Sequence, residues 1–308
     1  MITRRRFLKF LAALGLSGVA VASFAVIETL LQPRITRYSF RPNRWPRDLQ
    51  VKIAVLADLH ACEPWMPAER IASIAEITNK LNADMIVLLG DYAAGHRYVT
   101  AAVPSTEWAA ALGGLKAPLG VHAILGNHDW WDDKAVQRAG QGVPYGRRAL
   151  EAVGIPVYEN DVVRIKARGG AFWLAGLGDQ IAFVPSRRLR PGKRIGVDDL
   201  DGTLAKVSDD APIVLLAHEP DIAARVPERV SLTLSGHTHG GQLRLAGWSP
   251  IVPSRYGNRY AYGLVREKSD LIVSGGLGCS IIPIRFGVPP EIVLVTLGGD
   301  GANAAKPT

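Results

Sequence analysis

The sequence predicts an α/β fold in which two mixed β-sheets pack face to face between flanking helices, a four-layer α-β-β-α sandwich. Residues 51–57 are apolar except for Lys52, and such a run is typical of a strand buried on both faces. Similar runs then alternate with amphipathic helical segments, and this order favours parallel strands with helices outside. About nine predicted strands are enough for two sheets.

The first part of this pattern is the most regular. A helix opens at Pro67, because proline suits a first helical turn, and its apolar stripe is formed by Ile71, Ile74, Ala75 and Leu81. The predicted elements here are a strand at residues 51–57, that helix, a strand at 85–89, a helix at 105–115 and a strand at 121–125. The strand–helix–strand order indicates a parallel sheet.

The second part is richer in strands. The predicted elements are a helix at residues 145–153 and strands at 157–165, 171–177, 212–217, 230–235, 271–274 and 291–297. Arg168-Gly169-Gly170 predicts a hairpin turn between the first two of these strands. One large domain at residues 50–298 is the simplest division, preceded by a linker or edge segment at 35–49 and followed by a disordered tail at 299–308.

Residues 1–34 read as a twin-arginine-type signal or a membrane anchor. Paired arginines in Thr3-Arg-Arg-Arg-Phe-Leu-Lys9 precede an uncharged run at residues 10–27, the order of an export signal. The run has 18 residues, slightly fewer than the ~20 of a spanning helix. Ala20-Val-Ala22 could serve as a cleavage site, so cleavage and a retained anchor both stay open, with a periplasmic or outward-facing location in either case.

Charge and cysteine content exclude several classes of protein. The net charge of +8 divides into +4 for residues 1–34 and +4 for the rest, which is mildly basic and no nucleic-acid signature. Two cysteines, Cys62 and Cys279, exclude a disulfide scaffold and a thiolate zinc site, and they either pair in an oxidising compartment or stay unpaired. We expect a monomer.

Five short blocks supply side chains that bind metals. They are Asp58-Leu-His60, Gly90-Asp91, Gly126-Asn-His-Asp129, Ala217-His218 and Gly236-His-Thr-His239, and they hold five of the seven histidines. Each block follows a predicted strand, and ligands bind at the carboxyl ends of strands in α/β sheets. Taken singly, Asp58 could be a turn cap, Asn127 a turn residue and His218 a core histidine. Together the blocks predict a site for two divalent cations that share Asp91.

The donor types also narrow the metal. Mixed oxygen and imidazole ligation suits Mn²⁺, Fe or Zn²⁺ rather than Ca²⁺. A pair of cations that share one carboxylate is a general device for attacking phosphate esters.

The five blocks resemble the calcineurin-like metallophosphoesterase superfamily, whose pattern is D-x-H, G-D, G-N-H-[DE], H and G-H-x-H. The likeness covers roughly residues 50–298, and the tract Leu234-Ser-Gly-His-Thr-His-Gly-Gly-Gln242 resembles an exported or membrane-associated bacterial subgroup. The resemblance implies one metal held by Asp58, His60, Asp91 and His239, and another by Asp91, Asn127, His218 and His237. It further implies that His128 protonates the leaving oxygen while Asp129 orients its imidazole, after in-line attack by a metal-bridging hydroxide.

The substrate is less sharply indicated. The subgroup suggests a phosphodiester of a lipid or the cell envelope, including nucleotide-linked lipids. A phosphomonoesterase, protein phosphatase or nuclease is the alternative, and a non-catalytic scaffold with the same fold is a different class. The cationic stretch at residues 186–194 reads as a solvated loop or as a contact with an anionic membrane surface.

Other residues carry two readings each. Trp130 and Trp131 form either an apolar lip for acyl chains or core packing. Four arginines either lie solvated on the surface or bind a second phosphate: Arg244, Arg255, Arg259 and Arg285. His96 and His122 are expected to be structural.

Overall fold

A computed structural model of the chain describes residues 3–93, 98–185 and 195–299. Its helices are α1 (Arg4–Leu30), α2 (Ala68–Asn79), α3 (Ser105–Leu112), α4 (Asn127–Trp131), α5 (Lys134–Ala139), α6 (Tyr145–Ala152) and α7 (Leu200–Ala205), with 3₁₀ turns η1 (Pro220–Ala224), η2 (His239–Gly241) and η3 (Gly257–Tyr260). The predicted stretch at 186–194, the tail beyond Gly299 and His96 lie outside the described residues.

The first sheet has the order β1-β13-β2-β4-β6. Its strands are β1 (Arg34–Phe40), β2 (Val51–Leu56), β4 (Met85–Leu88), β6 (Val121–Ala123) and β13 (Glu291–Leu297). β2, β4 and β6 run parallel, β13 runs antiparallel to β2, and β1 runs parallel to β13. The carboxyl ends of β2, β4 and β6 therefore meet at one edge of the sheet.

The second sheet has the order β11-β12-β10-β9-β8-β7. Its strands are β7 (Asp161–Ala167), β8 (Gly170–Gly176), β9 (Ile213–Leu216), β10 (Leu232–Ser235), β11 (Gly263–Val265) and β12 (Asp270–Val273). β8, β9, β10 and β12 are mutually parallel, while β7 and β11 are antiparallel edge strands. A small ladder joins β3 (Cys62–Glu63) and β5 (Ala101–Ala102).

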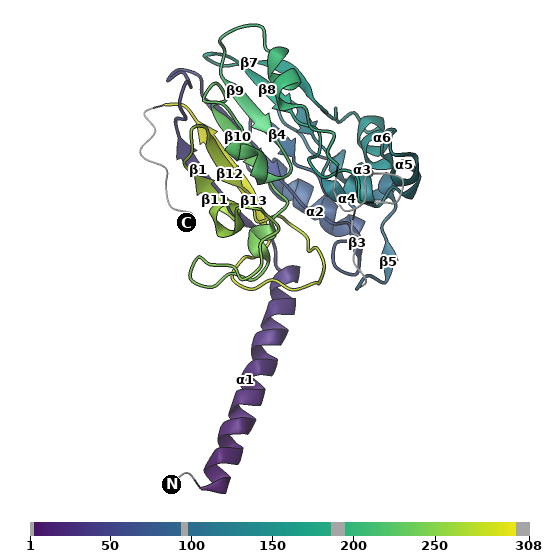
Figure 1. Cartoon of the computed structure of the whole chain (residues 1–308), viewed down its shortest axis with the longest axis vertical. Coiled ribbons are helices and arrows are strands. Elements are labelled where there is room, and N and C mark those ends of the chain that lie inside the picture. Colours follow the sequence, from purple (N-terminus) through teal and green to yellow (C-terminus); the bar gives the residue numbers. More distant parts are fainter. Residues whose placement is uncertain (1–2, 94–97, 186–194, 300–308) are drawn as a thin grey trace.

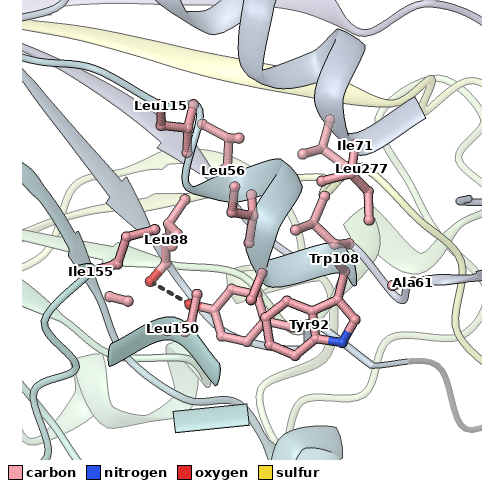
Figure 2. Close-up of a cluster of buried hydrophobic side chains, with 14 of the residues drawn as sticks. Leu56, Ala61, Ile71, Leu88, Tyr92, Trp108, Leu115, Leu150, Ile155 and Leu277 are labelled. Carbon is pink, nitrogen blue, oxygen red and sulfur yellow. Dashed lines mark hydrogen bonds between the residues drawn. The ribbon is translucent and has the colours of Figure 1, made fainter. Parts of the chain in front are cut away.

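Three apolar layers hold the domain together. The two sheets pack face to face through buried side chains such as Val55 and Val87 on one and Leu216 and Leu234 on the other. Helices α2, α3 and α6 cover the outer face of the first sheet, where Tyr92 lies between Leu88 and Trp108 (Figure 2). Helix α7 and turn η1 cover the outer face of the second sheet. The predicted two mixed sheets with flanking helices are confirmed.

Several details differ from the prediction. The strand predicted at 157–165 begins at Asp161, because Val157 instead forms an isolated bridge to Ala123. Strand β11 and helices α4 and α5 were not predicted, since their sequences are short and carry no full apolar period. Residues Arg34–Phe40 form the edge strand β1, whose buried Tyr38 and Phe40 face the core between the sheets.

Helix α1 projects away from the domain (Figure 1). Residues Leu8–Leu30 are long and apolar enough to cross a membrane. Its last turns differ from the rest of the helix, because Ala25, Glu28 and Thr29 are buried against the domain.

Candidate metal centre

The predicted donor blocks all lie at one edge of the molecule, where strands of both sheets end. Asp58 follows β2, Asp91 follows β4 and Asn127 opens α4 after β6, all in the first sheet. His218 follows β9 and His237 follows β10 in the second sheet. Donors from two sheets converge because the parallel strands of each sheet point their carboxyl ends the same way.

The backbone of the donor loops is unusual. Five donors have left-handed backbone conformations, with φ of 55° at Asp58, 49° at His60, 56° at Asp91, 68° at His237 and 52° at His239. Such conformations are strained in residues other than glycine, and they concentrate at functional sites. In each D-x-H or H-x-H block, the two left-handed donors flank one residue that is not left-handed.

Glycines let the loops approach each other closely. A Cβ at Gly126 would lie 2.5 Å from Asp91 Oδ1 and 2.6 Å from His218 Cε1. A Cβ at Gly90, whose φ is 94°, would lie 2.2 Å from the backbone nitrogen of Gly126. The loops after β4 and β6 are therefore packed so tightly that neither position has room for a side chain.

Donor atoms gather in three overlapping groups. Asp58, His60 and His239 form one, Asp91, His218 and His237 a second, and His60, Asp91 and His128 a third, with ligand atoms of each group within 4.8 Å of one another. Asp91 belongs to two of these groups. All of these side chains are buried except His128 and His237, which are half-buried.

Hydrogen bonds from the Nδ1 atoms of two imidazoles orient their Nε2 atoms toward the cluster. His218 Nδ1 donates to Leu89 O at 2.7 Å, and His60 Nδ1 donates to Ala93 O at 3.2 Å. When either ring is neutral, this bond keeps the proton on Nδ1 and leaves Nε2 free to bind a cation. These Nε2 atoms lie 3.2 Å and 3.6 Å, respectively, from the same oxygen of Asp91, Oδ2.

Two buried atoms at the centre of the site have no hydrogen-bond partner among the residues that the structure describes. They are His218 Nε2 and Asn127 Oδ1. Unpartnered buried polar atoms are rare and demand an explanation. Electron-rich atoms that face one another at about 3 Å repel unless a cation lies between them, and ligand atoms ~2.1 Å from a divalent ion have this spacing. The donor set therefore fits the metal that these side chains predict.

Burial sets the protonation of the other imidazoles. It lowers the pKa of His60 to about 3 and that of His237 to about 4, so both rings are neutral near pH 7 and free to bind a cation. Burial, with help from the neighbouring His60, also lowers the pKa of His239. Neutral imidazole is the form that binds metals.

The two buried carboxylates, Asp58 and Asp91, are stabilised in their ionised form by nearby positive charge. Burial raises the pKa of Asp58 to about 7, and the nearby Asp91 adds to this effect. Burial opposes ionisation of Asp91 as well, yet the surrounding imidazoles, led by His218, hold the pKa of Asp91 well below its ordinary value. The same pairing raises the pKa of His218 against the effect of burial. A cation beside Asp58 and Asp91 would favour the ionised form of both carboxylates.

Asp129 does not orient His128, and that part of the prediction is wrong. Its carboxylate accepts backbone N–H groups from Asp91 at 2.9 Å, Tyr92 at 2.9 Å and Gly126 at 2.8 Å. It therefore ties the loop after β4 to the loop after β6. His128 Nδ1 instead lies 3.4 Å from Asp132 Oδ2, one helical turn further along α4.

The position of His128 suits contact with a substrate. It is half-buried, and its ring lies 4.9 Å from the ring of His60 and 5.3 Å from that of Trp131. Burial lowers the pKa of His128, but Asp91 and Asp132 outweigh this and raise it above the ordinary value. The imidazole is thereby kept available as a proton donor.

The tryptophans and arginines divide between structural and surface roles. Trp130 is buried and packs on Phe183, so core packing is right for it, while Trp131 is half-buried beside His128. Arg259 pairs with Glu267 at 2.7 Å on the surface. Arg285 contradicts the expectation of a surface arginine, because it is fully buried.

Arg285 contacts the metal donor His239 on the ring nitrogen that faces away from the cluster. Its guanidinium donates to Gly275 O at 2.8 Å and Val288 O at 2.8 Å, and it lies 3.4 Å from His239 Nδ1. Sequence reasoning missed this role and that of Asp132. A helix assigned at residues 127–131 would have pointed to Asp132, since residues four apart share a helix face.

Two smaller predictions have clear outcomes. His122 is structural, with Nδ1 3.0 Å from Tyr158 Oη and Nε2 2.8 Å from Leu119 O. Cys62 and Cys279 are both buried free thiols, so the unpaired alternative holds.

Comparisons with known proteins agree with this geometry. The model of the calcineurin-like phosphoesterase family matches residues 51–241. The chain is 30% identical over 307 residues to the uncharacterized metallophosphoesterase YkuE of Bacillus subtilis, covering 96% of this chain and 98% of that protein. It is 28% identical over 285 residues to an uncharacterized metallophosphoesterase of Aquifex aeolicus, covering 92% of this chain and 98% of that protein.

A vertebrate relative is longer. A Danio rerio protein named transmembrane protein with metallophosphoesterase domain is 28% identical over 289 residues, covering 90% of this chain and 60% of that protein.

Fold and site together define a hydrolase that uses divalent metal ions to cleave phosphoric esters. The chain belongs to the calcineurin-like phosphoesterase family.

Proposed function

We propose that the chain is a dinuclear-metal phosphodiesterase anchored to, or exported across, a membrane, and that it cleaves phosphate esters of lipids or the cell envelope. The observation that carries the dinuclear part is the position of Asp91, which groups with His218 and His237 on one side and has His60, a member of the Asp58 and His239 group, 3.6 Å away on the other. One cation is held by Asp58, His60, Asp91 and His239. The other is held by Asp91, Asn127, His218 and His237, and each is Mn²⁺, Fe or Zn²⁺.

Bound cations supply Lewis-acid charge that neutralises phosphate oxygens and acidifies water. The chain's own residues position and protonate the substrate. His128 stands beside the cluster with a raised pKa and donates a proton to the leaving oxygen. Asp132 holds the other ring nitrogen of His128 and so orients it. Asp129 keeps the backbone of Asp91 and Gly126 in register, so that the donors keep their spacing.

The apolar helix α1 supports the location and the substrate class. Its twin-arginine-type beginning favours export of a folded domain, and its length allows it to remain as an anchor. An enzyme held at a membrane meets phosphoesters of lipids and envelope polymers. A phosphomonoesterase, protein phosphatase or nuclease on the same site is the second candidate. The complete donor set gives no support to a non-catalytic scaffold.

A comparison of aryl phosphates separates these candidates. The full chain with added Mn²⁺ is assayed on bis(p-nitrophenyl) phosphate and on p-nitrophenyl phosphate, with bound metal measured on the same sample. A diesterase cleaves the diester at least as well as the monoester. A panel of envelope phospholipids then tests the substrate class. Preference for the monoester, or hydrolysis of nucleic acid but none of the lipids, would replace the proposal by the second candidate.

A further inference from the structure

Strand register fixes the edge at which α1 leaves the domain. β1 begins at Arg34, which pairs with Glu291 at the start of β13. β13 runs antiparallel to β2 and pairs Val293 with Val55, so the start of β1 lies beside the carboxyl end of β2. Asp58 follows that end of β2. The helix therefore leaves at the edge that carries the metal donors.

The last turns of α1 are built into this edge. Arg285 N donates to Ala25 O at 2.8 Å, and Gly287 N donates to the Glu28 carboxylate at 3.0 Å. The rings of Phe24 and Phe286 meet edge to face at 5.9 Å. The end of the helix is thus fixed on the 285–287 segment, whose Arg285 also reaches His239.

Four exposed apolar side chains lie on the loops that neighbour this junction. Trp248 and Leu245 flank a two-residue turn and exchange backbone hydrogen bonds of 2.9 Å and 2.8 Å. These two side chains are 59% and 61% exposed, while Ile251 and Ile281 are each 73% exposed. We call Leu245, Trp248, Ile251 and Ile281 the apolar collar.

Hydrogen bonds join the apolar collar to the helix. Arg244 N donates to Phe286 O at 2.8 Å, directly beside the ring contact with α1. Gln242 binds the segment of Ile281 from both sides, donating to Ile282 O at 3.0 Å and accepting from Ser280 N at 2.7 Å. Ile251 lies against the same loop, because a Cβ at Gly241 would be 2.7 Å from its carbonyl oxygen. The loops of the collar, the 285–287 segment and the end of α1 therefore lie together.

The length of free helix places a bilayer against this surface. Ala25, Glu28 and Thr29 of α1 are buried against the domain, while Ile27 and Leu30 stay exposed. The part of the apolar span that precedes this contact is residues 8–24, 17 in all. At ~1.5 Å per residue they reach about 26 Å, less than the ~30 Å of a bilayer's hydrocarbon core. Because the free helix is shorter than the hydrocarbon core, the junction between α1 and the domain must lie at the boundary of the bilayer. The surface of the domain around the end of α1 then touches the bilayer and should be apolar. The collar is such a surface, and its Trp248 is a residue type that favours the membrane interface.

We propose that the apolar collar is a bilayer-contact surface that seats the catalytic domain on the membrane around α1, with its metal-donor edge toward the lipid. Large exposed apolar side chains gathered on one face mark such surfaces. If the proposed function holds, this seat presents the site to phosphoesters carried by the membrane itself.

Trp248 reports directly on this contact. The other six tryptophans all lie in the described part of the chain and are buried or half-buried. The full chain is reconstituted into phosphatidylcholine vesicles with ordinary or brominated acyl chains, which quench tryptophan at contact. We expect brominated lipid to quench the wild type, and Trp248→Phe to lose most of that quenching. Trp173→Phe is the matched control and should keep it, because Trp173 lies in the middle of β8 opposite Ile213, at the end of β9 away from the metal donors.

A second variant tests the apolar residues without removing the reporter. Leu245→Ser/Ile251→Ser should shift Trp248 emission to longer wavelength in vesicles and weaken its quenching. Equal quenching of the wild type and Trp248→Phe would overturn the proposal, as would Trp248 emission that is the same with and without lipid. Coverage of the collar by a partner protein or a second copy would give this second result. None of these readouts depends on hydrolysis, so they stand apart from the proposed activity.

Discussion

The donor residues hold a backbone conformation that their own chemistry does not favour. A left-handed φ in a residue other than glycine costs of the order of 1–3 kcal/mol, and five donors adopt it. The surrounding bonds compensate, because Asp58 accepts from His237 N at 2.9 Å and Asp91 accepts from His128 N at 2.7 Å. Each carboxylate is thus tied to another donor loop, and the cluster is set before a cation arrives.

Asp91→Asn tests the shared carboxylate with almost no change in shape. The variant keeps one oxygen that can bind one cation, but it loses the negative charge and the second oxygen that would bind the other cation. We expect the bound metal to fall by at least half and turnover by roughly 10³-fold or more, since Lewis-acid stabilisation is worth several kcal/mol. Metal content and hydrolysis are measured together, with the exposed Asp210→Asn as control. Full metal content with normal turnover would disprove the sharing.

The assignment of His128 shows where sequence reasoning stops at the residue scale. Its place beside Asn127 in the G-N-H-D block was enough to single it out. The residue that contacts its ring could not be identified in the same way. Asp129 is its neighbour in sequence, but the carboxylate beside its ring belongs to Asp132, which caps the end of α4. Deriving the partner needed a five-residue helix that has too few residues to show a period.

His128→Ala should leave metal binding intact and slow the chemistry. We expect turnover to fall roughly 10²–10⁴-fold, the usual worth of a positioned acid. The loss should be small for nitrophenyl esters, whose leaving groups need no proton, and large for alkyl esters. Asp132→Asn should give a weaker loss of the same kind. An equal loss on both ester types would assign His128 a role other than proton donation.

At the scale of elements, the loop after β4 is supported by helix α3. Tyr92 follows Asp91, its hydroxyl donates to Ile124 O at 2.8 Å, and its ring stacks on Trp108 at 5.3 Å (Figure 2). Trp108 is fully buried and comes from α3. The position of the shared carboxylate therefore depends on the packing of a helix that carries no donor.

Trp108→Ala should destabilise the fold and loosen the site together. Removing a buried indole costs roughly 3–5 kcal/mol. Tyr92→Phe keeps the ring stack and should cost about 1 kcal/mol, the usual net value of one hydrogen bond. Urea unfolding of the full chain in detergent measures both. Similar small effects for the two variants would mean that α3 does not hold this loop.

Elements with a clear hydrophobic period were predictable, and those fixed by tertiary contacts were not. Residues 51–57, apolar except for Lys52, and residues 85–89 are short apolar runs, and both form strands of the sheet centre. β1 alternates buried and exposed residues beside a proline-rich stretch, so the sequence also allowed a linker there. The contact of α1 with residues 285–287 joins segments more than 250 positions apart, which no local pattern encodes.

At the scale of the whole molecule, the site exists only where the two sheets meet. Asp58, Asp91 and Asn127 come from the first sheet, and His218, His237 and His239 come from the second. Burial and the nearby Asp91 raise the pKa of buried Asp58, so ionising Asp58 in the folded chain is costly until a cation lies beside it. Metal binding should therefore stabilise the whole domain, by about 2.7 kcal/mol when free metal is 100 times its Kd.

The most direct measurement is a titration of metal-stripped full chain with Mn²⁺, in which bound metal, the thermal midpoint and hydrolysis of bis(p-nitrophenyl) phosphate are recorded on the same samples. A dinuclear hydrolase predicts about two metal ions per chain, a midpoint that rises by several degrees, and activity that appears as the second site fills. Hydrolysis that is unchanged after stripping, or activity that is complete with a single bound ion, would contradict the dinuclear site.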